Sequence, residues 1–243
     1  MKRFSHGNIE RAVGLLAVLT VLTISIGGLV EIVPLFTIDK TMERVEGVRP
    51  YTPLELLGRN IYIREGCYTC HSQQVRPFRD EVDRYGPYSL AVESRYDHPF
   101  QWGSKRTGPD LARVGGKYSN QWHAAHFINP REVVPESIMP VYSFLSDRNV
   151  SDWDIRDHLA ANKAVGVPYT DEQLVNARVD LLEQARPDGD HEALQARYPN
   201  AAVGDMDGDP TRTTEMDAII AYMQILGQMV DFTNIKPEDL KQQ

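Results

Sequence analysis

Apolar residues form one long run near the N-terminus and then recur at helical spacing in shorter segments. The run begins at Ala12, meets no charged residue before Glu31 and continues in apolar residues to Phe36. A helix rises about 1.5 Å per residue, so a run of this length spans the roughly 30 Å hydrocarbon core of a bilayer. Residues 12–36 are therefore predicted to form a transmembrane helix, with Glu31 either hydrated near its outer end or facing a partner helix.

A cleaved signal peptide is the alternative to an uncleaved anchor. The run exceeds the about 7–15 apolar residues of a typical signal peptide, and no clear A-x-A-like cleavage site follows it, which favours the anchor. Lys2, Arg3 and Arg11 precede the run, and positively charged flanks stay on the cytoplasmic side. We therefore expect a single-pass protein of a bacterial inner membrane, with residues 1–11 in the cytoplasm and the large remainder in the periplasm.

Helix-start signals and helical spacing predict further helices beyond the anchor. The first signal is a capping box formed by Thr52 and Glu55, with Pro53 at the first helical position. This helix is expected to end near Glu65, where Gly66 permits a turn. Three more helices are predicted to begin at Ser119, Ser151 and Thr170 and to end near Asn129, Lys163 and Ala185, and a last one to cover Thr214 to Gly227.

These elements predict an all-α protein in which a polar linker over residues 37–50 joins the anchor to a domain over residues 51–243. Residues 72–117 are rich in Gly, Pro, Arg and Tyr without a long periodic run, which predicts an ordered functional loop wrapped over a cofactor. Residues 146–212 are expected to be an insertion before the last helix. Within the insertion, residues 186–212 are polar and are predicted to be exposed.

Both cysteines of the chain lie in the run Cys67-Tyr68-Thr69-Cys70-His71. A C-x-x-C-H run is typical of the covalent attachment site of a c-type haem. The two sulfurs add to the porphyrin vinyl groups, and the adjacent imidazole is placed to ligate the iron from one face. The run therefore predicts one covalently bound haem c, with its iron.

Three other interpretations of this run are weaker. A zinc site would need about four ligands, and no second cysteine pair exists to supply them. A thioredoxin-like redox pair would sit in a βαβ context, and no such alternation surrounds Cys67. A disulfide from Cys67 to Cys70 would close a small, strained ring that contributes little stability.

A second axial ligand is expected, because an electron-transfer haem usually has two, and a thioether raises its potential relative to two histidines. Met139 is the favoured candidate: it lies between Pro135 and Pro140, and these prolines keep the segment from being helical. A rigid loop can hold a sulfur against iron at low entropic cost. The other methionines beyond the anchor are expected in the core of the last helix, in an acidic turn or next to the membrane: Met216, Met223, Met229, Met206 and Met42.

Other polar features carry no predicted site. His123 and His126 lie three apart on one helix face, and without a third ligand they are expected to be packing or surface residues; His98 is a minor alternative haem ligand. Residues 205–209 faintly resemble a calcium loop, but the glycine comes too early, so a solvated acidic turn is expected. The formal net charge of −8 argues against nucleic acid as a partner.

Several motifs, in order, resemble one family. Residues 108–111, Gly-Pro-Asp-Leu, and the later Met139 resemble class I cytochromes c in general. The similarity becomes more specific with residues 31–34 after the anchor, the haem-attachment run, residues 102–111 and residues 135–140. Together these motifs resemble the mono-haem subunit, subunit II, of cbb-type cytochrome c oxidases. The resemblance covers about residues 8–145 and resumes at the last helix.

This resemblance implies roles for five residues. Cys67 and Cys70 would form the thioether bonds, and His71 and Met139 would be the axial ligands of the haem iron. In class I cytochromes the carbonyl of the Gly-Pro-x-Leu proline accepts the hydrogen bond from the other nitrogen of the ligand histidine. Pro109 is the matching position, and its bond would fix the tautomer and orientation of the imidazole.

The implied function is electron relay from a periplasmic cytochrome c to an oxidase core that reduces oxygen to water, so this chain is not itself the oxygen-reducing site. The implied partners are a membrane-embedded catalytic subunit, a di-haem cytochrome c subunit and a soluble cytochrome c, with the lipid bilayer around the anchor. The alternatives are the haem c subunit of a quinol–cytochrome c reductase, which generally carries its anchor at the C-terminus, a haem-based sensor, and a purely structural assembly subunit.

Overall fold

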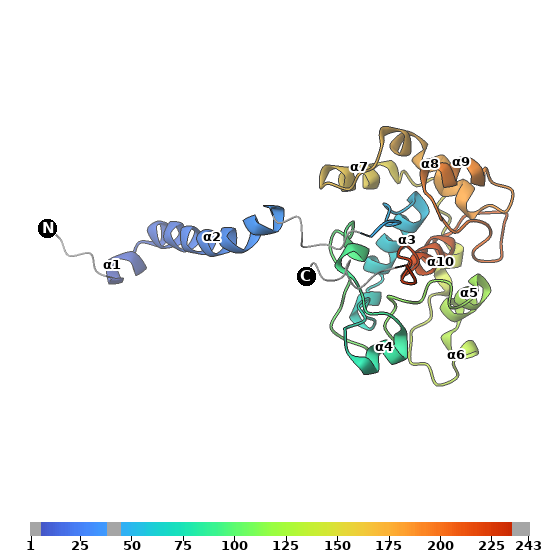
Figure 1. Cartoon of the computed structure of the whole chain (residues 1–243), viewed down its shortest axis with the longest axis horizontal. Helices are drawn as coiled ribbons and strands as arrows, with labels where there is room; N and C mark the ends of the chain where they lie inside the picture. The colour runs from blue at the N-terminus through green and yellow to red at the C-terminus, as the bar shows by residue number, and fades with distance from the viewer. Residues whose placement is uncertain (1–5, 38–44, 235–243) are drawn as a thin grey trace. The chain divides into compact units, whose positions relative to one another are not determined.

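The computed structural model describes residues 6–37 and 45–234 and divides the chain into two compact units (Figure 1). One is N-terminal, and the other takes in residues 45–234. The regular secondary structure of the described residues is helical, and their β-structure is limited to an isolated bridge between Asn149 and Thr214. The predicted all-α class is confirmed, whereas the predicted domain boundaries remain predictions.

The N-terminal unit consists of two helices. Helix α1 covers His6–Glu10, which the sequence pattern did not predict, and α2 covers Val13–Thr37. Within α2, Val13–Pro34 is long and apolar enough to cross a membrane. The predicted membrane-spanning helix over residues 12–36 is therefore present, and it gives the chain a candidate membrane anchor.

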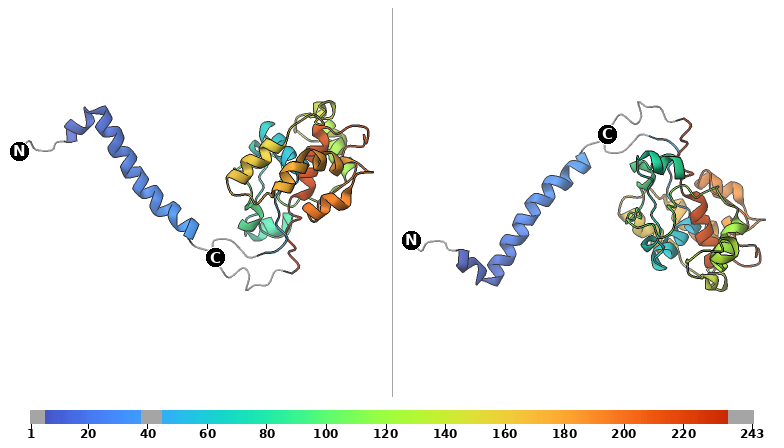
Figure 2. Two further views of the ribbon diagram at one scale, coloured as in Figure 1. Left: turned by 90° about the horizontal axis from the view of Figure 1, so that it is seen from above. Right: turned by 90° about the horizontal axis from the view of Figure 1, so that it is seen from below.

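Helices α3 (Pro53–Arg64) and α10 (Glu215–Ile225) pack against each other at the centre of the second unit (Figures 1 and 2). Each begins with a capping box, at Thr52 and Thr214, in agreement with the predicted helix starts. At their closest approach, a Cβ on Gly58 would lie 1.9 Å from the Ala218 carbonyl oxygen, so only glycine permits this packing.

Helix α5 (Asn120–Ile128) begins at the predicted cap Ser119 and ends at Asn129. The short helix α6 (Pro130–Val133) and the 3₁₀ helix η3 (Ser143–Asp147) follow it. Both elements contact α5, so the chain between them turns back over that helix.

The insertion contains three helices, α7 (Arg156–Ala164), α8 (Asp171–Ala185) and α9 (His191–Arg197). Helix α8 has the predicted start and end. The predicted start of α7 was wrong by five residues, because Ser151 hydrogen-bonds to Asn149 in a turn instead of capping a helix.

The prediction that residues 186–212 form an exposed segment was also wrong. Leu194, Tyr198, Ala201 and Met206 are all buried in the hydrophobic core. The sequence does not reveal this burial, because the buried apolar residues are few and widely spaced and only Leu194 lies in a helix, the two-turn α9.

Residues 72–117 are mostly irregular, as predicted, but the segment contains two short helices. Helix α4 covers Arg79–Tyr85, and the 3₁₀ helix η2 covers Ala91–Ser94. Neither Phe78 nor Leu90 caps these helices with a polar side chain of its own. Without a polar capping residue at either start, the sequence pattern left both helices undetected.

Candidate functional site

The cysteine run follows directly from the end of α3. Glu65 ends the helix, and Gly66 has a φ of 72°, a left-handed conformation that glycine adopts at little cost. The 3₁₀ helix η1 (Cys67–Thr69) then turns the chain. Both cysteines are free thiols, with Cys67 partly buried and Cys70 exposed. The local structure therefore presents two thiols at the surface end of a core helix.

Burial raises the pKa of the Cys67 thiol to about 12. A thiol with that pKa is neutral near pH 7, whereas redox-active cysteines have lowered pKa values that favour the thiolate. The local electrostatics therefore argue against a thioredoxin-like function for the pair Cys67 and Cys70.

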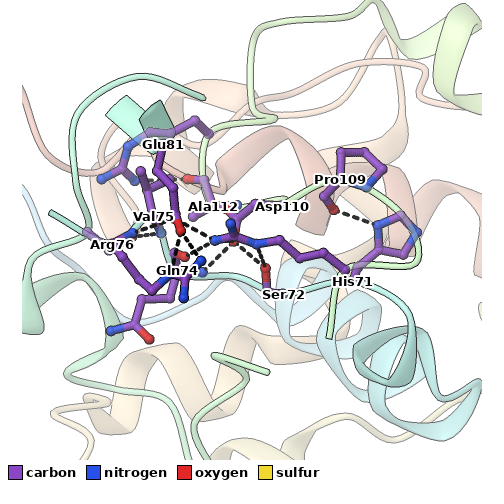
Figure 3. Close-up of polar contacts among 12 residues, drawn as sticks. His71, Ser72, Gln74, Val75, Arg76, Glu81, Pro109, Asp110 and Ala112 are labelled. Carbon is purple, nitrogen blue, oxygen red and sulfur yellow. Dashed lines mark hydrogen bonds and ion pairs between the residues drawn. The ribbon is translucent and has the colours of Figure 1, made fainter. Parts of the chain in front are cut away.

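His71 is oriented by a backbone carbonyl from a distant part of the chain. Its Nδ1 donates a hydrogen bond to the Pro109 carbonyl oxygen at 2.8 Å (Figure 3). A carbonyl can only accept, so Nδ1 carries the proton and Nε2 keeps a free lone pair. This is the arrangement that a metal-ligating histidine requires, with its other nitrogen held by an outer partner.

Gly108 packs directly against the same imidazole. A Cβ at this position would lie 2.3 Å from Cε1 of His71, closer than any real contact permits. The Gly108 backbone N–H donates to the Cys70 carbonyl at 2.9 Å. The ring of His71 is therefore packed against the loop as well as hydrogen-bonded to it, and only glycine fits beside it.

Asp110 ties this loop to the irregular segment after His71 (Figure 3). Its buried carboxylate accepts hydrogen bonds from the Ser72 hydroxyl at 2.6 Å, the Gln74 backbone N–H at 2.8 Å and the Ala112 backbone N–H at 2.9 Å. Such charge-assisted bonds are stronger than neutral ones. They fix the position of Pro109 relative to His71.

Arg106 extends the network to helix α4. Its guanidinium donates to the Ser72 hydroxyl at 2.7 Å, to the Gln74 carbonyl at 2.8 Å and to Glu81 of α4 at 2.7 Å. The hydrogen bond from Arg106 is the largest cause that lowers the pKa of Glu81 to about 2. Glu81 is therefore ionised at neutral pH, and its charge is balanced within the loop network.

The roles of Ser72, Glu81, Arg106 and Asp110 were missed from the sequence. Asp110 and Arg106 lie in the motif around Gly-Pro-Asp-Leu, but that motif does not show which side chains join it to residues 72–76. Glu81 lies in a helix that the sequence pattern did not reveal. No signal in the sequence alone pairs these residues.

Met139 lies in a different part of the chain, between α6 and η3. It is partly buried against the hydrophobic core, and its backbone N–H donates to the Ser137 hydroxyl at 3.2 Å. Beyond it, the Tyr142 N–H donates to the Phe127 carbonyl of α5 at 2.8 Å. The proline-bounded segment is therefore fixed onto α5.

The other methionine predictions can be compared with the structure. Met216 and Met223 are buried in α10, as predicted for core residues. Met206 is buried too, and Asn120 donates a hydrogen bond to its sulfur, so it does not lie in a solvated turn as expected. Met42 lies outside the described residues.

The residues fit a covalently bound haem. Cys67 and Cys70 supply two unbridged thiols at the required spacing, and His71 keeps Nε2 free as an iron ligand. Met139 supplies a thioether from a segment held by hydrogen bonds. One imidazole and one thioether form the ligand set of electron-transfer haems.

The structure joins a helical domain, a C-x-x-C-H histidine bonded to a proline carbonyl and an apolar helix before them. These are features that the resemblance to a membrane-anchored class I cytochrome c implies. The chain belongs to the family described as cytochrome c oxidase, mono-heme subunit/FixO, which matches residues 6–230. No curated protein matches it. The match covers nearly all of the chain and agrees with the predicted resemblance to the mono-haem subunit of cbb-type oxidases.

Proposed function

We propose that this subunit relays electrons from a periplasmic cytochrome c to the catalytic subunit of its oxidase through one haem c. Membership of the family assigns this subunit to a cytochrome c oxidase. The relay role is supported by the hydrogen bond between His71 and the Pro109 carbonyl, which prepares an imidazole for iron immediately after two free thiols. The haem, when bound, supplies an iron that changes between the ferric and ferrous states.

Each site residue has a task in the proposed relay. Cys67 and Cys70 would hold the porphyrin covalently, and His71 and Met139 would be the ligands of the iron. Pro109 keeps the His71 proton on Nδ1, which leaves Nε2 for the metal. A haem held by both ligands would serve electron transfer, and oxygen reduction would belong to the catalytic subunit.

The apolar helix α2 would keep this subunit close to its catalytic partner. A chain confined to the membrane meets a membrane-embedded catalytic subunit at a high effective concentration. We propose that its N-terminus is cytoplasmic and its haem domain periplasmic, where a di-haem cytochrome c subunit and a soluble cytochrome c are the further partners. The positive residues before the helix support this orientation.

A pyridine haemochrome spectrum of the purified membrane complex, combined with haem staining of a denaturing gel, tests the proposal. We expect one covalent haem in a band near 27.5 kDa, together with b-type haem in the complex. Replacing both Cys67 and Cys70 by Ala should remove the stain from this band, and exchange of Ser151 for Ala should not. A colourless wild-type band would contradict the proposal. Carbon monoxide binding with Met139 intact would instead favour a haem sensor.

A further inference from the structure

Helix α5 lies on the Met139 side of the site. It contacts both α6 and η3, the elements that precede and follow the Met139 segment. The hydrogen bond from Tyr142 to Phe127 fixes that segment directly onto the helix. His71 is held instead by Gly108 and Pro109 from the loop after α4. Side chains on the inner face of α5 are therefore candidates to approach a haem from the same side as Met139.

Two imidazoles on this helix have buried nitrogens without a hydrogen-bond partner among the described residues. They are Nε2 of His123 and Nδ1 of His126. Buried polar atoms in proteins are nearly always paired, so an unpaired one calls for an explanation. The His126 ring is also held in place, because it stacks on Trp122 with ring centroids 4.7 Å apart and an angle of 15°.

The two histidines differ in their surroundings. His123 is 3% exposed and packs edge-on against Tyr118 and Trp122, and the nearby histidine that affects it is His126. His126 is only partly buried and interacts electrostatically with His71. His126 is thus the histidine of α5 that lies toward the predicted iron ligand. Burial is the largest cause that lowers its pKa, so its imidazole is neutral at pH 7.

We propose that His126 is the reserve axial ligand of this cytochrome: when the Met139 thioether is lost from the iron, the His126 imidazole takes its place. This inference rests on the proposed function. In the exchange one iron–sulfur bond breaks and one iron–nitrogen bond forms. Both ligands are neutral, so the exchange itself requires neither a proton nor an electron.

The exchange would protect a cytochrome that works beside an oxygen-reducing centre. Methionine oxidises to its sulfoxide, and Met139 is partly exposed. With His126 in reserve, the iron remains six-coordinate after such damage and closed to oxygen. Two histidines give a lower potential than histidine with methionine. The altered haem would therefore be harder for its electron donor to reduce, and the lost methionine ligand would be visible in its spectrum.

The test uses the purified full complex and four variants. Met139→Ala should lose the sulfur–iron charge-transfer band and yet remain low-spin, with a lowered midpoint potential and negligible binding of carbon monoxide. Adding His126→Phe to Met139→Ala should convert the c-type haem to a high-spin form that binds carbon monoxide. The matched control adds His123→Phe instead and should stay low-spin. The His126→Phe single variant should keep its haem and the methionine band, which shows that the substitution itself is tolerated.

The outcomes separate this inference from the proposed function. A wild-type chain without covalent haem or without the methionine band overturns the function itself. If wild type has both but Met139→Ala is already high-spin, only the reserve ligand is overturned. The same holds if the double variant with His126→Phe stays low-spin, or if the His123→Phe control becomes high-spin, because another group then supplies the ligand.

Discussion

The region from Gly66 to Met139 and the insertion over residues 146–212 are stabilised in different ways. The first carries every predicted site residue, mostly on irregular backbone that the Asp110 and Arg106 network fixes in place. The insertion contains the helices α7, α8 and α9, and its role is visible in where its polar side chains reach. The first region carries the proposed iron ligands, whereas the insertion supports the helix that leads to them.

The insertion binds the N-terminal end of α3 through buried hydrogen bonds. Thr52, the cap of that helix, donates to Gln184 of α8 at 2.5 Å, and the Tyr169 hydroxyl donates to the Tyr51 carbonyl at 2.8 Å. Arg49 donates to the Pro199 carbonyl at 2.7 Å and forms an ion pair with the buried Glu55. Stability and ligand geometry therefore depend on separate sets of residues. Variants should be able to change one without the other.

The largest effect is expected from Gly108→Ala, which should disturb the haem-attachment region. The added methyl group cannot fit beside His71, so the ring must leave the Pro109 carbonyl. We expect most of the covalent haem, or its low-spin spectrum, to be lost in the purified complex. Gly166→Ala is the control: it lies in the insertion with open space around it and a φ of 105°, so it should cost only some stability. Equal haem loss in both variants would contradict the conclusion that stability and ligand geometry depend on separate sets of residues.

The next effect is expected in the insertion. Asp180 is fully buried and forms an ion pair with Arg197. Asp180→Ala leaves the arginine without its buried partner and should lower the free energy of unfolding by about 3 kcal/mol, measured by denaturant titration. The haem spectrum and potential should not change. The exposed pair of Asp152 with Arg178 provides the control, because Asp152→Asn should cost less than about 1 kcal/mol.

A pH dependence is expected from Asp217 in α10. Burial raises its pKa from 3.8 to about 7, so the fold favours the protonated form. The contribution of Asp217 to stability should therefore be complete below about pH 4, be lost as pH rises from about 4 to 7 and then stay constant, with a slope of at most about 1.4 kcal/mol per pH unit. Asp217→Asn, which can still accept the Thr214 N–H bond, should flatten the profile of unfolding free energy between pH 5 and 8. If the unfolding free energy of the variant still depended on pH as in wild type, the prediction would be wrong.

The smallest effect is expected from Glu81, on the site side. Its pKa is lowered from 4.5 to about 2 by the hydrogen bond from Arg106 and by its further partners. Its stabilising contribution is thus complete above about pH 4.5 and is lost as pH falls toward 2. Glu81→Gln should reduce this acid sensitivity in unfolding experiments. The neighbouring exposed Asp83→Asn, whose ion pair with Arg79 spans 3.6 Å, should leave the profile as in wild type.

Local sequence was sufficient for much of the fold because the interactions that define it span only a few residues. Thr52, Thr170 and Thr214 each accept a hydrogen bond from the backbone at the start of their own helix, as their capping patterns predict. The apolar run predicted α2 because its length and lack of charge are properties of consecutive residues. The local pattern did not predict α4 and α9, because both helices are short and lack a long series of apolar residues at helical spacing.

The cysteine run by itself determined the chemistry of this protein, since two thiols and an imidazole at fixed spacing suit one type of cofactor. Only the tertiary structure decided what holds that chemistry in place. The bond from His71 to Pro109 joins residues 38 apart, and the pair Thr52 and Gln184 is 132 apart. Such pairs form only when the whole chain has packed, because nothing in the local pattern of either partner depends on the other.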